Sequence, residues 1–161
     1  MSNLIVDALI EIPTGSQNKY EFDKEAGVFR LDRVLYSPFH YPTEYGYIEK
    51  TLAEDGDPLD VLVLSTVPTF PGCVIETRVV GVLVMSDDKG QDEKLLGVPT
   101  KDPRFAQVQS LDDVAPHILK EIAHFFQVYK DLENKATKIE GWKGVDDAKR
   151  ILDESYARYN Q

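Results

Sequence analysis

The stretch EDGDPLDVLVL, residues 54 to 64, joins a cluster of acids to an apolar run. Four acids fall between Glu54 and Asp60, and the apolar run 61–64 that follows predicts a buried strand. Two like charges about 4 Å apart repel by about 4 kcal/mol at an effective dielectric of about 20. Acids crowded beside a core strand therefore indicate a bound cation or carboxyls with raised pKa values.

Three of these acids have a spacing that suits a metal ion. In an extended segment Asp55 and Asp57 lie on one face, because side chains alternate along a strand. Asp60 follows where a turn at Gly56 and Pro58 bends into the strand, so it can converge on the same point. Oxygen-only ligand sets select hard cations such as Mg²⁺, Mn²⁺ or Ca²⁺.

A second acidic loop follows another apolar run. Residues 79–85 predict a strand, and Asp87, Asp88 and Asp92 come after it. Two such loops could face each other at one end of a barrel and bind several ions together. The alternative is that both are solvated acidic turns. Neither loop is an EF-hand: counted from Asp55, glycine falls at position 2 and Thr66 stands where a bidentate glutamate is required.

The rest of the chain predicts strands first and helices last. Strands are expected at 4–12, 19–23, 28–35, 60–65, 74–85 and 95–99, with an ordered irregular segment or short strands at the aromatic stretch 36–47. A first helix is expected to begin at Ser110 or Asp112 and to extend to residue 133, and a second follows EGWKG at 140–144. This order predicts an α+β fold, with a small closed OB-like β-barrel of about five strands and two main helices packed outside. Without repeats or linker-like stretches, residues 1–161 are expected to form a single domain.

Composition limits the partners. The formal net charge of −10 disfavours nucleic acid and anionic membranes and favours cations. One cysteine, no leader-like N-terminus and no apolar run near the roughly 18 residues of a membrane span predict a cytoplasmic protein. If the ligand is an anion, local positive charge or metal must reverse the field at the site.

Three basic residues stand out against this acidic background. Lys19, Arg33 and Lys130 each lie close to aromatic or acidic positions. Arg33 has the strand parity of Phe29 and Leu31, so its side chain is expected to point inward, where a guanidinium needs an anion. The alternative for each is an ordinary surface charge. No nucleophile elbow, P-loop or dinucleotide-binding glycine motif is present.

EDGDPLDVLVL resembles the signature of the soluble family I inorganic pyrophosphatases. Further segments follow in the order of that family: IEIP (10–13), KYE (19–21), LDR (31–33), YPTEYGYI (41–48), VVGVLVMSDDKGQDEK (79–94) and HFFQVYKDLE (124–133). The similarity extends from about residue 8 to about residue 142. It implies Mg²⁺-dependent hydrolysis of pyrophosphate to two orthophosphates, by direct attack of a water activated by metal.

The resemblance also implies roles for individual residues. The metal ligands would be Asp55, Asp60, Asp87 and Asp92. The catalytic residues would be Asp57, as the base that orients or deprotonates the water, with Glu21 and Tyr45. The substrate-binding residues would be Lys19, Arg33, Tyr45, Lys94, Tyr129 and Lys130. Supporting roles would fall to Glu11, Tyr41 and Asp88.

The resemblance further implies several Mg²⁺ ions in each active site, with Mn²⁺ or Zn²⁺ as substitutes. It implies pyrophosphate and orthophosphate as ligands and a homohexamer, with His124 at a subunit interface. Two other hypotheses are a calcium- or nucleic-acid-binding module on a small barrel, with the aromatic residues as stacking platforms, and a catalytically idle homologue. The charge of −10 and the lack of a basic stripe argue against nucleic acid.

Overall fold

A computed structural model describes residues 3–161. The strands are β1 (Ile5–Ile12), β2 (Asn18–Asp23), β3 (Val28–Val34), β4 (Glu44–Tyr47), β5 (Asp60–Val63), β6 (Val74–Asp87), β7 (Gly90–Gln91), β8 (Lys94–Pro99) and β9 (Lys138–Lys143). The α-helices are α1 (Pro116–Val128) and α2 (Val145–Tyr159), and short 3₁₀ helices are η1 (Pro103–Phe105), η2 (Leu111–Asp113) and η3 (Asp131–Glu133). The expected α+β class with two main helices is confirmed.

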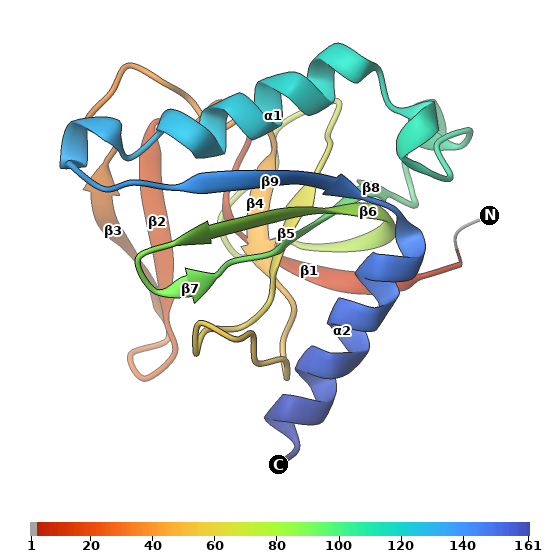
Figure 1. Cartoon of the computed structure of the whole chain (residues 1–161), viewed down its shortest axis with the longest axis horizontal. Helices are drawn as coiled ribbons and strands as arrows, with labels where there is room; N and C mark the ends of the chain where they lie inside the picture. Colours follow the sequence, from red (N-terminus) through yellow and green to blue (C-terminus); the bar gives the residue numbers. More distant parts are fainter. Residues whose placement is uncertain (1–2) are drawn as a thin grey trace.

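Five strands pair in a ring. β1 lies antiparallel to β4, β4 antiparallel to β5, β5 parallel to β8, β8 antiparallel to β6, and β6 returns to β1. The 14-residue strand β6 also pairs with β7 and β9 (Figure 1). Because β6 contacts four other strands, it connects the ring to the hairpin that carries the second acidic loop.

The core lies on both faces of the ring strands. Along β5, Val61 and Val63 belong to one cluster of buried side chains and Leu62 to the other, as alternation along a strand requires. Helix α2 packs on the first cluster through Ala148, Ile151 and Leu152. Helix α1 packs on the second through Ile122, Phe125 and Phe126. The apolar run of EDGDPLDVLVL is therefore the buried strand that its sequence predicts.

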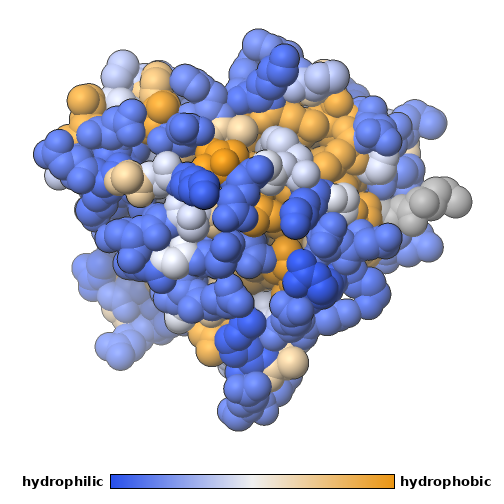
Figure 2. Space-filling view, viewed as in Figure 1, coloured by the Kyte–Doolittle hydropathy of each residue, from blue (hydrophilic) through white to orange (hydrophobic). Residues whose placement is uncertain are grey.

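One face of the molecule is covered mainly by polar side chains, with apolar side chains visible between them (Figure 2). Within the described residues, no helix is long and apolar enough to cross a membrane.

The prediction of one helix from Ser110 or Asp112 to residue 133 is wrong. Asp113 closes a capping box with Ser110, but the helix that begins there is only η2. Pro116 disfavours helical geometry at Ala115, so α1 starts at the proline, where a missing N–H costs nothing. The chain then leaves the α-helix at Tyr129 and forms η3 separately.

The predicted strand parity of Arg33 with Leu31 is wrong, although the Arg33 guanidinium does meet anions as expected, at Asp32 and Glu133. β2 and β3 form a separate two-stranded sheet, in which Lys19 pairs with Arg33 and Tyr20 with Leu31, so Asp32 is an extra residue in β3. A bulge of this kind shifts the alternation of side chains. Leu31 is 54% exposed, whereas Arg33 lies opposite Lys19 and on its face of the sheet.

Candidate active site

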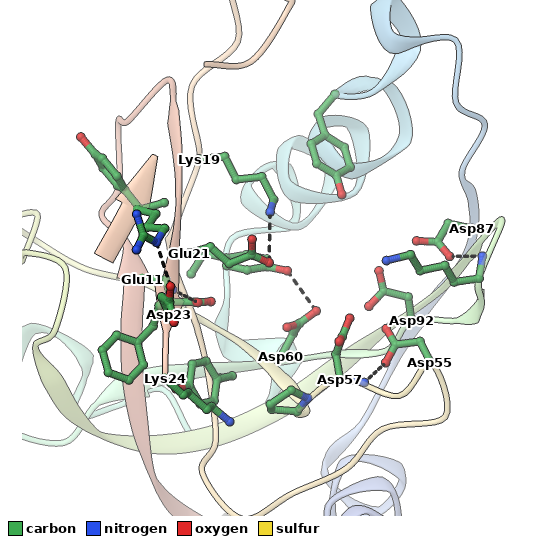
Figure 3. A pocket seen from close by; sticks show the side chains of 18 of the residues that line it. Glu11, Lys19, Glu21, Asp23, Lys24, Asp55, Asp57, Asp60, Asp87 and Asp92 are labelled. Atoms are coloured by element: carbon green, nitrogen blue, oxygen red, sulfur yellow. Dashed lines mark hydrogen bonds and ion pairs between the residues drawn. The ribbon is translucent and has the colours of Figure 1, made fainter. Parts of the chain in front are cut away.

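One cleft collects charged side chains from distant parts of the chain. It has a volume of about 490 Å³, and Figure 3 shows its acids pointing toward one another from several elements. Its acids are Glu11, Glu21, Asp23, Asp55, Asp57, Asp60, Asp87 and Asp92. Its cations are Lys19, Lys24, Arg30, Lys89 and Lys130, and its tyrosines are Tyr20, Tyr45, Tyr47 and Tyr129.

Strand pairing explains why the two acidic loops meet. The first loop leads into β5 and the second into β8, and these neighbouring strands are parallel, with Asp60 opposite Lys94. Parallel neighbours begin at the same edge of a sheet, so both loops lie at that edge. The expectation that the two loops face each other is met by Asp55, Asp57, Asp60, Asp87 and Asp92; Asp88 does not line the cleft.

The first acidic loop is a turn rather than the extended segment expected. Gly56 has φ 90°, a conformation that glycine adopts without steric cost. The Asp57 backbone N–H donates to Asp55 Oδ1 at 3.1 Å. Both aspartates nevertheless line the cleft. Burial raises the pKa of Asp55, and the neighbouring acids Asp92 and Asp57 add to the rise.

Lys94 lies at the centre of the acids. Its side chain is 1% exposed, and its ammonium donates to Asp60 Oδ2 at 2.8 Å and to both oxygens of Asp92 at 3.2 Å. Tyr45 OH lies 3.2 Å from the same nitrogen and donates to Asp60 Oδ2 at 3.0 Å. Burial raises the pKa of Asp60 to about 7, although the attraction of Lys94 opposes that rise.

The aspartates suit a hard divalent cation by chemistry, since their donors are all carboxylate oxygens. In residues 3–161, however, no three acidic, histidine or cysteine side chains converge closely enough to hold a metal ion. Asp60 and Asp92 instead face Lys94. Binding a cation therefore requires these carboxylates to be shared between the metal and the ammonium.

The opposite wall comes from β1 and β2. Glu11 on β1 is buried, and its Oε2 accepts the Phe22 backbone N–H at 2.9 Å, which fixes β2 against β1. Burial raises the pKa of Glu11. Lys19 on β2 lies 3.3 Å from Asp32 Oδ2 and 4.0 Å from Glu21 Oε1. These contacts hold Lys19 and Glu21 at the mouth of the cleft.

The end of α1 supplies the third wall. Tyr129 is the C-cap residue of α1 and stacks on Phe125, with ring centroids 5.2 Å apart. Lys130 Nζ lies 3.9 Å from Asp87 Oδ2, and burial lowers the Lys130 pKa. Tyr41 does not line the cleft; it is buried and meets the Tyr45 ring edge-on at 5.7 Å. Tyr41 thus supports a residue that does line it.

Arg33 does not line the cleft either. Its Nη1 donates to Asp32 Oδ2 at 2.5 Å, and its Nε lies 3.0 Å from Glu133 Oε1. Asp32 and Glu133 were not among the residues assigned from the sequence. The segments LDR and HFFQVYKDLE contain them, but their role depends on the bulge in β3 and on η3, which a linear pattern does not reveal.

A cleft that combines carboxylates for cations with lysines and tyrosines for an anion defines a class: enzymes that act on phosphate groups through metal ions. The family model described as "Inorganic pyrophosphatase" matches residues 8–160. An inorganic pyrophosphatase of Geobacillus stearothermophilus is 64% identical over 159 residues, which is 99% of this chain and 96% of the relative. One from Nostoc sp. is 57% identical over 96% of this chain and 92% of its own length.

Solved structures agree with the sequence relatives. The inorganic pyrophosphatase of Helicobacter pylori superposes with a TM-score of 0.95 at 44% identity, covering 98% of this chain and 94% of that one. The inorganic pyrophosphatase of Thermus thermophilus superposes with a TM-score of 0.94 at 48% identity, covering 98% of this chain and 92% of that one. The chain belongs to the inorganic pyrophosphatase family, as the resemblance of its motifs implies.

Proposed function

We propose that this protein is an inorganic diphosphatase that hydrolyses pyrophosphate to two orthophosphates by direct attack of water, with Mg²⁺ as its working metal. Membership of a metal-dependent family over nearly the whole chain supports the reaction. The observation that carries the proposal for the site is the cleft itself, where aspartates from both acidic loops face lysines from β2 and from the end of α1.

The metal sites are assigned to Asp55, Asp60, Asp87 and Asp92, which all line the cleft. Bound Mg²⁺ would lower the pKa of a water and neutralise the charge of pyrophosphate. Mn²⁺ and Zn²⁺ are proposed as substitutes, because both accept oxygen ligands.

Asp57 is assigned as the base. It lines the cleft from the turn before β5, and no hydrogen bond or ion pair from a described side chain occupies its carboxylate. A carboxylate free of such partners can accept a hydrogen bond from the attacking water. Glu21 and Tyr45 line the same cleft and assist, Glu21 through water and Tyr45 through its contact with Asp60.

The phosphate groups are assigned to Lys19, Arg33, Tyr45, Lys94, Tyr129 and Lys130. Four of these line the cleft around the aspartates, and Lys94 supplies positive charge from beneath them. Phosphoryl transfer needs mostly positioning and charge stabilisation, which such a set provides. Glu11, Tyr41 and Asp88 are assigned supporting roles.

The assembly is proposed to be a homohexamer of the cytoplasm, with His124 at an interface. His124 is exposed and lies beside Phe39, with ring centroids 6.1 Å apart, and the two residues line a shallow groove of about 190 Å³. Val67 and Phe70 are 68% and 63% exposed, which suits surfaces that become covered in an assembly.

Orthophosphate release from pyrophosphate, measured with and without Mg²⁺ and with ATP as the control substrate, tests the reaction. The proposal expects fast release from pyrophosphate that stops when Mg²⁺ is removed, and little release from ATP. Absence of release at any Mg²⁺ concentration would favour the idle-homologue hypothesis instead.

A further inference from the structure

The β2–β3 sheet meets the segment after α1 at a buried pair of charges. Arg33 Nε lies 3.0 Å from Glu133 Oε1, and the Glu133 side chain is 7% exposed. Glu133 Oε2 and Arg33 Nε are both buried without a hydrogen-bond partner, so the two side chains meet as an ion pair. A carboxylate in this position is costly unless a cation compensates it, so Arg33 and Glu133 hold each other in place.

This pair is the end of a longer chain of charges. Lys19 Nζ lies 3.3 Å from Asp32 Oδ2, and Arg33 Nη1 donates to the same oxygen at 2.5 Å. The bulge at Asp32 puts Lys19 and Arg33 on one face of the sheet, where the two cations would repel each other. Asp32 holds the two cations together, and Glu133 holds Arg33 from the far side.

Glu133 connects this chain to another wall of the cleft. It ends η3, which follows Tyr129 and Lys130 directly. The sequence of contacts therefore runs from Lys19 on β2, through Asp32 and Arg33 on β3, to the segment that carries Tyr129 and Lys130. Glu133 itself does not line the cleft, and its carboxylate faces Arg33.

We propose that Glu133 is a positioning residue: its carboxylate fixes Arg33, and through Asp32 also Lys19, at the spacing that the phosphate groups of the substrate require. The inference rests on the proposed function and on the assignment of Arg33 to substrate binding. Because Glu133 contacts none of the aspartates assigned to metal or water, its loss weakens substrate binding and spares the hydrolytic step.

The first test is Glu133→Gln, which keeps the shape of the side chain and removes its charge. The KM for pyrophosphate is expected to rise on the order of tenfold, while kcat changes by less than about twofold, because the loosened cation contributes to binding. Asp131→Asn is the matched control, since Asp131 is an exposed acid in the same 3₁₀ helix. Its KM is expected to stay at the wild-type value.

The second test asks whether Glu133 acts through Arg33. In a double-mutant cycle with Arg33→Gln, the Glu133→Gln change is expected to have little further effect on KM. An equal rise in KM in both backgrounds would mean that Glu133 acts through general packing, and the inference would fall. An unchanged KM in Glu133→Gln alone would overturn it as well.

Two further measurements keep the outcomes distinct. Glu133→Asp keeps the negative charge on a side chain shorter by one methylene. Its KM is expected to lie between those of the wild type and Glu133→Gln. If the Glu133→Gln variant does not fold, Glu133→Asp provides the test in its place. Wild-type KM in Arg33→Gln would overturn the inference while leaving the reaction intact. Failure of the wild-type protein to release orthophosphate would instead remove the proposed function.

Discussion

Lys94 supplies a fixed positive charge at the point where the aspartates gather. Its ammonium contacts Asp60 and Asp92 and lies 5.0 Å from the centre of the Tyr45 ring. Burying an ammonium is favourable only with anions close by, so lysine and aspartates stabilise one another in the metal-free protein. In the metal-free protein Lys94 thus occupies the carboxylates of the cleft floor, and an incoming cation must share them with its ammonium.

Asp60 makes metal binding depend on pH. Burial raises its pKa to about 7, so below that pH the carboxyl holds a proton that a metal must displace. We expect the affinity for Mg²⁺ to fall by up to about tenfold per pH unit as the pH is lowered from 7 to 5, and to level off above 7. Calorimetric titration of the metal-free protein with Mg²⁺ at several pH values measures this. A pH-independent affinity over that range would contradict the raised pKa.

Asp57→Asn tests the base. The amide keeps the shape of the carboxylate but cannot accept the proton, so kcat is expected to fall about 10²- to 10⁴-fold. The far-ultraviolet circular dichroism spectrum and thermal midpoint should stay close to wild type, since Asp57 is exposed. Asp7→Asn, an exposed aspartate on β1 that lies outside the cleft, is the control. Near-normal kcat in Asp57→Asn would exclude Asp57 as the base.

At the scale of elements, the stability of the five-stranded ring depends on how closely neighbouring strands approach each other. Gly46 on β4 lies against β1, where a Cβ would clash with the carbonyl of Leu9. Gly46→Ala is expected to lower the free energy of unfolding by at least about 1–3 kcal/mol, because the backbone of a paired strand must shift. Urea unfolding measures the change.

Gly144→Ala is the matched control for that experiment. A Cβ at Gly144 would meet no atom within 4 Å, and the residue has an ordinary φ of −82°. We expect Gly144→Ala to lower the free energy of unfolding by less than about 1 kcal/mol, as for an alanine at a helix N-cap. Equal losses for the two glycines would show that the β1–β4 contact does not limit stability.

The sequence predicts elements well where one residue pattern determines them. Residues 61–63 of the apolar run lie in a strand and are buried, and 145–159 is a helix, as expected. Strand β9 was missed, because Lys138–Lys143 is mostly polar and only half-covered by its neighbours. The motifs predicted most residues of the cleft, since 11 of the 15 that were named line it. Lys94 and Tyr41 each contact a lining residue, whereas Arg33 and Asp88 do not line it.

The sequence did not reveal the contacts between residues that lie far apart in the chain. The bulge at Asp32 depends on the pairing of β3 with β2, and the Arg33–Glu133 contact joins residues far apart in the chain. Lys94 was assigned from its motif as a substrate ligand, but its burial between two aspartates follows from the parallel pairing of β5 and β8. Tertiary pairing sets these positions, and no local pattern carries that information.

At the scale of the whole molecule, the prediction to test is that the protein assembles as a homohexamer. Light scattering should give a mass about six times the 18.2 kDa of one chain. His124→Glu is expected to lower that mass, because a buried charge without a partner destabilises an interface. His117→Glu, an exposed histidine one heptad earlier on α1, is the control. A monomer mass for the wild-type protein would refute the hexamer.

The ring of strands also imposes an order on folding. β1 emerges first from the ribosome, but residues 5–9 pair with 74–78 on β6, and β5 pairs with β8 later still. Such long-range pairings must overcome the entropy of closing large loops before they contribute any stability, which slows folding. β1 can pair with β4, and β2 with β3, while the chain is still short, but the ring closes only once β6 and β8 are present. Since the two acidic loops meet only across β5 and β8, nascent chains acquire the cleft at the end of this process.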